Sequence, residues 1–116
     1  MLFRSGFDAA GAVKNSEHWS SLLERLPDGT ADLIGYDKKV DSKTAALING
    51  FNAHALELDD GQRFAMIHLG ASIISAIKAA ADENDISGDQ FKTGVIMGYE
   101  TACRVAIAMQ IGRAHV

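Results

Sequence analysis

Small side chains recur at every fourth position in the last apolar segment of the chain, at Gly94, Gly98, Ala102 and Ala106. This spacing places them on one face of a helix, where they allow a second helix to approach closely. Ser87 and Gln90 stand just before the segment at the spacing of a helix capping box. The pattern therefore predicts a long helix from Ser87 to about Met109, packed tightly against another helix.

The N-terminal part of the chain predicts a shorter helix that ends in a turn. Asn15 or Ser16 is placed to cap it, and Pro27-Asp28-Gly29 has the chemistry of the turn that ends it. Its apolar residues follow the i, i+3, i+4, i+7 spacing: Trp19, Leu22, Leu23 and Leu26. Residues 30–40 then form an extended connector, for which a short hairpin is the more specific alternative.

Two further helices are expected between this connector and the long C-terminal one. The first begins at Asp41 or Ser42 and runs to about Leu58, with Asn49-Gly50 as a point of close packing. The next runs from Phe64 or His68 to about Ala81 and is apolar on most of its faces. Together the segments predict an all-α chain of about four helices with an extended connector near residues 30–40.

The composition excludes several classes of protein. With 116 residues, 47% of them hydrophobic and 22% charged, the chain suits one modest globular domain. A net charge of −4 argues against nucleic acid as the main partner. The apolar run 64–81 is interrupted by polar residues, so no membrane span is expected. The single cysteine, Cys103, is expected in the core of a protein from a reducing, cytoplasmic compartment.

The two ends of the chain differ in pattern from the sequence between them. Residues 2–5 and 111–116 can be encoded by reverse-complementary DNA strings that correspond to a widely used sequencing adapter. We therefore expect residues 1–5 and 111–116 to be non-native, with natural sequence at residues 6–110. On this interpretation the natural protein continues in both directions, and the coding DNA would test it.

Charged and imidazole groups are unusually dense between the second and third expected helices: His54, Glu57, Asp59, Asp60, Arg63 and His68. Such groups beside apolar sequence need partners or a use. Asp59 and Asp60 fall where a helix end disfavours negative charge, so Arg63 or a substrate group is expected to compensate them. A neutral His68 can supply a proton or a hydrogen bond to an anionic substrate group.

Other interpretations of these residues remain open at this point. His54, which shares a helix face with Glu57, is favoured as a hydrogen-bonded core histidine, and Asp59 alone could bind backbone amides in a loop. His54, Glu57 and Asp60 could also form half of a carboxylate-bridged metal site, although the second half is missing from the sequence. A non-enzymatic helical interaction module, using the stripe of small residues as its surface, is a further alternative.

Three ordered motifs resemble the MmgE/PrpD family, which includes 2-methylcitrate dehydratase and cis-aconitate decarboxylase. The first, A-x-x-N-G-x-x-A-H-x-x-[DE]-x-D-D, is matched over residues 46–60. The second, H-x-G-A, begins at His68, and the third, G-Y-E-x-x-x-R, runs from Gly98 to Arg104. The resemblance covers residues 29–109.

The resemblance implies a large helical domain joined to a smaller α/β domain, usually in a homodimer, with no metal or iron–sulfur cofactor. It implies a lyase acting on a small polycarboxylate by dehydration or decarboxylation, with epimerisation or isomerisation as an alternative. His68 is the expected acid/base or carboxylate-binding group, and Glu57 and Asp60 are expected to orient it or the substrate. The expected substrate contacts are Asp59, Gly61, Gln62 and Arg63.

The chain departs from the family pattern at two places. Many members have histidine where Gln62 stands, and the spacing from Asp60 to His68 differs by one residue from some members. The resemblance also places a further catalytic histidine, lysine and tyrosine beyond Met109. The chain by itself is therefore expected to be inactive and poorly soluble.

Overall fold

The computed structural model describes residues 17–55, 57 and 59–110 of the chain. Four helices and one two-stranded sheet occupy these residues, which confirms the expected all-α class. The expected caps Asn15 and Ser16, and the suspected non-native residues 1–5 and 111–116, lie outside the described part. The elements are α2 (Glu17–Arg25), β1 (Ala31–Asp32), β2 (Lys39–Val40), α3 (Ser42–His54), α4 (Gly70–Glu83) and α5 (Gly88–Gln110).

The connector near residues 30–40 is a short hairpin, the more specific of the two alternatives. Ala31 pairs with Val40 and Asp32 with Lys39 in antiparallel register. Gly35 holds the turn with φ of 86°, a left-handed conformation that glycine adopts at little cost. Ala31, Val40 and their neighbour Leu33 are buried and contribute to the core with Leu23, Ala45, Ile48 and Ala79.

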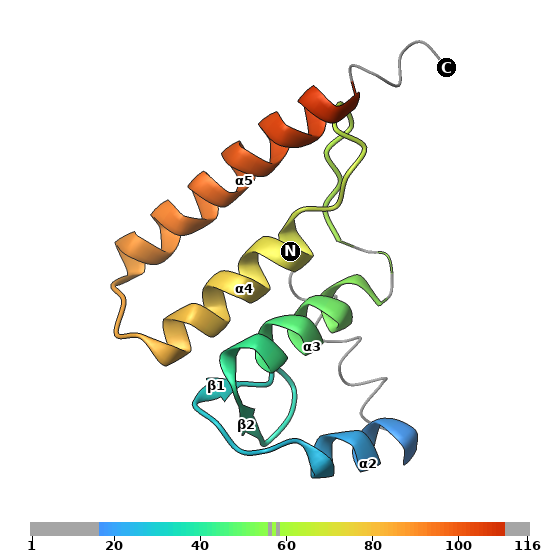
Figure 1. Ribbon diagram of the computed structural model, residues 1–116, viewed down its shortest axis with the longest axis vertical. Coiled ribbons are helices and arrows are strands. Elements are labelled where there is room, and N and C mark those ends of the chain that lie inside the picture. The colour runs from blue at the N-terminus through green and yellow to red at the C-terminus, as the bar shows by residue number, and fades with distance from the viewer. Residues whose placement is uncertain (1–16, 56, 58, 111–116) are drawn as a thin grey trace.

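Helix α4 lies between α3 and α5 (Figure 1). On one side Gly50 of α3 faces it so closely that a Cβ there would lie 3.2 Å from the Ala71 carbonyl oxygen. On the other side a Cβ at Gly98 of α5 would lie 2.7 Å from Ile73 Cγ2. Both expected close-packing points, Asn49-Gly50 and the glycine part of the small-residue stripe, are therefore confirmed.

The helix starts follow the capping chemistry of the sequence. Asp41 accepts hydrogen bonds from the Lys43 and Thr44 amides at the start of α3. At the start of α5 the Ser87 amide donates to Gln90 Oε1 at 2.7 Å, and the Gln90 amide donates to Ser87 Oγ at 3.2 Å. The expected capping box is confirmed.

Two helix boundaries next to the charged segment differ from the prediction. Helix α3 ends at His54 rather than near Leu58, because the chain turns and Glu57 adopts φ of 51°, which a right-handed helix does not contain. His54 and Glu57 therefore do not share a helix face. Helix α4 begins at Gly70, and an isolated antiparallel bridge between Gln62 and Ile67 occupies the segment before it.

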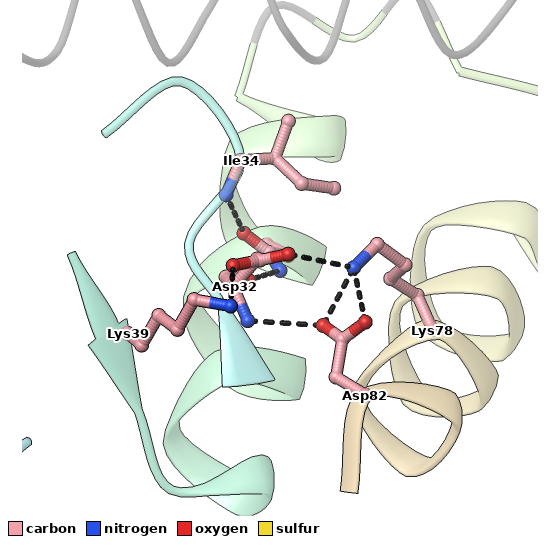
Figure 2. Close-up of polar contacts among 6 residues, drawn as sticks. Asp32, Ile34, Lys39, Lys78 and Asp82 are labelled. Atoms are coloured by element: carbon pink, nitrogen blue, oxygen red, sulfur yellow. Dashed lines mark hydrogen bonds and ion pairs between the residues drawn. The ribbon is translucent and has the colours of Figure 1, made fainter. Parts of the chain in front are cut away.

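Charged side chains tie the hairpin to α4 (Figure 2). The Asp32 amide donates to Asp82 Oδ2 at 2.9 Å, and the Lys78 ammonium lies 2.5 Å from the same oxygen and 3.6 Å from Asp32 Oδ2. Lys39 approaches the other Asp32 oxygen at 3.0 Å, and this hydrogen bond lowers the pKa of the Asp32 carboxyl, with both lysine charges acting in the same direction. The network holds the hairpin against the C-terminal part of α4.

Asn49 makes the corresponding link from α3. Its side chain is buried, accepts a hydrogen bond from the Ile34 amide at 2.9 Å and donates one to the Asp32 carbonyl at 3.0 Å.

Cys103, expected in the core, is half-buried on α5. None of the described helices is both long and apolar enough to cross a membrane.

Candidate active site

The connector between α3 and α4 carries most of the predicted site residues, and Asp60 anchors it. Asp60 Oδ1 accepts a hydrogen bond from the Gly70 amide at 2.8 Å, at the start of α4. Its Oδ2 accepts one from the Tyr99 hydroxyl of α5 at 2.9 Å. A carboxylate at a helix N-terminus satisfies an unpaired amide and interacts favourably with the helix dipole. Asp60 therefore links two helices through one side chain.

Tyr99 and Gly70, the two donors to the Asp60 carboxylate, are packed closely around it. Burial of the phenol raises the pKa of Tyr99 to about 12, and the hydrogen bond to Asp60 acts in the same direction. A Cβ at Gly70 would lie 2.5 Å from Asp60 Oδ1 and 2.6 Å from the Tyr99 hydroxyl. Only glycine fits at position 70 while both contacts are kept.

Asp59 lies between two histidines, one on each side of the connector. Its Oδ2 lies 2.8 Å from His54 Nδ1, at the last residue of α3, and 3.6 Å from His68 Nδ1, just before α4. The two imidazole rings are 5.4 Å apart. The Asp59 side chain is only 5% exposed, whereas those of His54 and His68 are 50% and 54% exposed.

The hydrogen bonds define the proton positions on both neutral rings. His68 Nδ1 lies 2.7 Å from the Asp60 carbonyl oxygen, which can only accept, so Nδ1 carries the proton and Nε2 keeps its lone pair. His54 Nδ1 in the same way donates to the Asp59 carboxylate. Each neutral imidazole therefore has an unprotonated Nε2, which is the form that a general base needs.

His54, Asp59 and His68 line a pocket of about 460 Å³ between α3 and α4. Helix α3 supplies its apolar wall through Ala46, Leu47, Gly50 and Phe51, and α4 adds Ala71 and Ser72. An apolar pocket with a few convergent polar groups is the usual form of a small-molecule site.

Three other predicted site residues border a second pocket. Gly61, Gln62 and Arg63 line this pocket of about 310 Å³, which His68 also borders. Gln62 Oε1 accepts a hydrogen bond from the Ala65 amide, and the Arg63 guanidinium lies 5.1 Å from the centre of the Phe64 ring. His68 therefore lines both pockets.

Two expectations from the sequence are wrong in their geometry. His54 is not a core histidine, because half of its side chain is exposed and its ring borders the pocket. The metal alternative grouped His54 with Glu57 and Asp60, but in the described part of the chain Glu57 is exposed and lines neither pocket, and Asp60 is engaged by Gly70 and Tyr99. The group that the fold brings together is His54, Asp59 and His68.

Tyr99 is the site residue that the sequence did not single out. It stands inside the third motif, Gly98-Tyr99-Glu100, yet it is 39 residues from Asp60 and nothing in the spacing links the two. Only the packing of α5 against α4 brings the phenol to the carboxylate.

Comparison with known proteins relates the chain to one protein family. The model of the MmgE/PrpD N-terminal domain matches residues 9–116. A cis-aconitate decarboxylase-like protein of Aspergillus oryzae is 31% identical over 113 residues, which cover 87% of this chain and 23% of that protein. Cis-aconitate decarboxylase of Aspergillus terreus is 31% identical over 88 residues, which cover 72% of this chain and 18% of that protein. No solved structure gives a significant match.

The fold and the site define a helical domain with histidine and carboxylate groups at a pocket. The chain belongs to the MmgE/PrpD family, through its N-terminal domain, and the resemblance inferred from the motifs is confirmed. It spans less than a quarter of the length of the curated relatives that it matches.

Proposed function

We propose that this chain forms one wall of the active site of a lyase that acts on a small polycarboxylate such as cis-aconitate or methylcitrate. The observation that carries the proposal is His68, whose Nδ1 donates to the Asp60 carbonyl, so that Nε2 of the neutral ring keeps its lone pair, and whose side chain borders two pockets. The names of the Aspergillus relatives support the same substrate class.

In a dehydration, neutral His68 would accept the proton from the carbon next to a carboxylate, and the electron pair of that C–H bond would form the double bond. The hydroxyl would leave as water with a proton donated by an acid elsewhere in the complete protein. In a decarboxylation, carbon dioxide leaves and its bonding electrons stay on the substrate carbon, which protonated His68 would then protonate. Both reactions use the same ring nitrogen in opposite protonation states. Epimerisation would begin with the same proton removal.

The remaining residues have roles that follow from their contacts. Asp59 holds His54 in place through a hydrogen bond and lies beside His68, and Asp60 is a positioning residue that fixes the connector and the His68 tautomer. Arg63, with Gly61 and Gln62, would bind a substrate carboxylate in the pocket beyond His68, because arginine pairs well with carboxylates. Glu57, exposed on the connector, would act only where a substrate or another part of the protein approaches it.

The test is product analysis with the complete protein that carries this segment. We expect it to convert cis-aconitate or methylcitrate, with release of carbon dioxide distinguishing decarboxylation from loss or addition of water. A complete protein that folds and leaves both compounds and their close polycarboxylate analogues unchanged would contradict the proposal.

A helical interaction module is the second candidate, and one observation favours it. Helix α5 exposes a series of large apolar residues to solvent: Ile96, Met97, Val105, Ile107 and Met109. Exposed apolar residues in such number are typical of an interface. Under the lyase proposal they are covered by further parts of the same protein, so a complete protein in which α5 remains exposed and binds another macromolecule would favour the module.

A further inference from the structure

We propose that His54, Asp59 and His68 form a binding site for one divalent transition-metal ion of the zinc type. Each residue offers one ligand atom, and the three atoms lie within 4.8 Å of one another. Two imidazole nitrogens and one carboxylate oxygen are a donor set that Zn²⁺ and its neighbours in the first transition row prefer. The proposal does not depend on the lyase activity.

An unpaired buried oxygen is the second observation that points to a cation. Asp59 Oδ1 is inaccessible to solvent, and no described residue donates a hydrogen bond to it. The side chain as a whole is 95% buried, since 5% of it is exposed, and it lies at the wall of the pocket. A buried carboxylate with an unpaired oxygen is costly, and a cation bound at its other oxygen, Oδ2, would offset the negative charge.

The separation of the ligand atoms is within reach of a metal ion. With metal–ligand bonds of about 2.0–2.2 Å, two ligands of one tetrahedral ion stand roughly 3.3 Å apart. His54 Nδ1 and Asp59 Oδ2 are 2.8 Å apart, and His68 Nδ1 and the same oxygen are 3.6 Å apart. The widest of the three separations must shorten, which rotation of the two half-exposed imidazoles allows. The histidine hydrogen bonds to Asp59 and Asp60 would then be exchanged for bonds to the ion.

The donor set also defines which ions should not bind. Mg²⁺ and Ca²⁺ require mainly oxygen ligands, and the cluster supplies only one carboxylate. With three protein ligands, a tetrahedral ion keeps one position for water or for a carboxylate of a small molecule in the pocket. If His68 is the acid/base group of the proposed lyase, an ion bound at its Nδ1 would inhibit it, because Nε2 would then carry the proton of the neutral imidazole and could not act as a base.

Isothermal titration calorimetry with zinc chloride tests the site on the purified chain, prepared without a polyhistidine tag. We expect one Zn²⁺ per chain and no heat of binding with magnesium chloride. His54→Gln and His68→Gln should each weaken Zn²⁺ binding by more than about tenfold, because each removes one ligand. His18→Gln removes a histidine outside the proposed set and serves as the matched control, which should bind as the unmodified chain does.

Circular dichroism shows whether each variant is folded, and the visible spectrum of bound Co²⁺ reports imidazole coordination. A folded chain that binds no Zn²⁺ would overturn the proposal, as would undiminished binding by a folded His54→Gln variant. Loss of binding in His18→Gln would overturn it as well. None of these measurements uses a substrate, so failure of the metal site and failure of the lyase proposal are distinguishable.

Discussion

At the scale of single residues, Asp60 connects three parts of the site through three oxygens. Its two carboxylate oxygens accept from Gly70 and Tyr99, and its carbonyl oxygen accepts from His68 Nδ1. A shift of the connector would therefore alter the packing of α5 and the tautomer of His68 together. Because each carboxylate oxygen already accepts a hydrogen bond, these contacts support the positioning role proposed for Asp60.

Removal of the Tyr99 hydroxyl should weaken this anchor. Tyr99→Phe keeps the ring but leaves Asp60 Oδ2 without its donor, so the free energy of unfolding should fall by about 1–2 kcal/mol. Urea denaturation followed by circular dichroism measures the change. An unchanged midpoint would show that the hydrogen bond contributes nothing to stability.

The raised pKa of Tyr99 predicts how stability depends on alkaline pH. The neutral phenol is favoured in the folded state, so its contribution is fully present below the ordinary value of 10.0 and is lost as the pH rises toward about 12. Ultraviolet absorbance of the tyrosinate should show one transition near pH 12 that is missing in Tyr99→Phe. A Tyr99 transition at the ordinary value would contradict the buried hydrogen bond.

Gly70 and Gly88 form a matched pair of helix-start glycines. Gly70→Ala forces a methyl group against Asp60 Oδ1 and the Tyr99 hydroxyl and should lower the free energy of unfolding by about 1–3 kcal/mol. Gly88→Ala, at the start of α5, meets nothing within 4 Å and should be neutral or slightly stabilising. Equal unfolding midpoints for the two variants would contradict the crowding at position 70.

At the scale of elements, the hairpin is attached to α4 through charge (Figure 2). The Lys78 ammonium forms ion pairs with Asp32 of β1 and with Asp82 of its own helix, and the Lys78 side chain is 31% exposed. The comparable pair on α5, Lys92 and Asp89, lies in solvent, with side chains 75% and 93% exposed. The first pair should matter more, because ion pairs exposed to water contribute little.

Lys78→Met should therefore destabilise the chain by about 1–2 kcal/mol, while Lys92→Met should stay within about 0.5 kcal/mol of the unmodified chain. Thermal unfolding of both variants measures the difference. Because its lysine neighbours lower the pKa of Asp32, the network should stabilise the fold above pH 3.8 and lose this effect as the pH falls below that value. Equal effects of the two substitutions would contradict this assignment.

The capping and packing signals of the sequence were sufficient to predict most elements. Ser87 with Gln90 marked the start of α5, Asp41 marked the start of α3, and the glycines of α5 predicted its close contact with α4. The end of α3 could not be predicted in the same way. Glu57 and Met66 adopt φ of 51° and 53°, and no glycine or proline marks either of these turns.

At the scale of the whole molecule, the candidate site was predictable in its location but only partly in its geometry. The dense charges of residues 54–68 identified the segment, and His68, Asp59 and Asp60 do meet there. The pairing of His54 with Asp59 depends on the chain turning immediately after α3, which local helix propensity does not reveal. Family membership came from three motifs, whereas the Tyr99–Asp60 contact required the packed helices.

The central claim is that His68 supplies the acid/base group of a lyase active site. The most direct measurement is kcat for the complete protein carrying His68→Gln, compared with the matched variant His18→Gln. Loss of a general acid or base should lower kcat by about 10²–10⁴-fold, whereas His18→Gln should turn over substrate as the unmodified protein does. A folded His68→Gln protein with unchanged kcat would contradict the account.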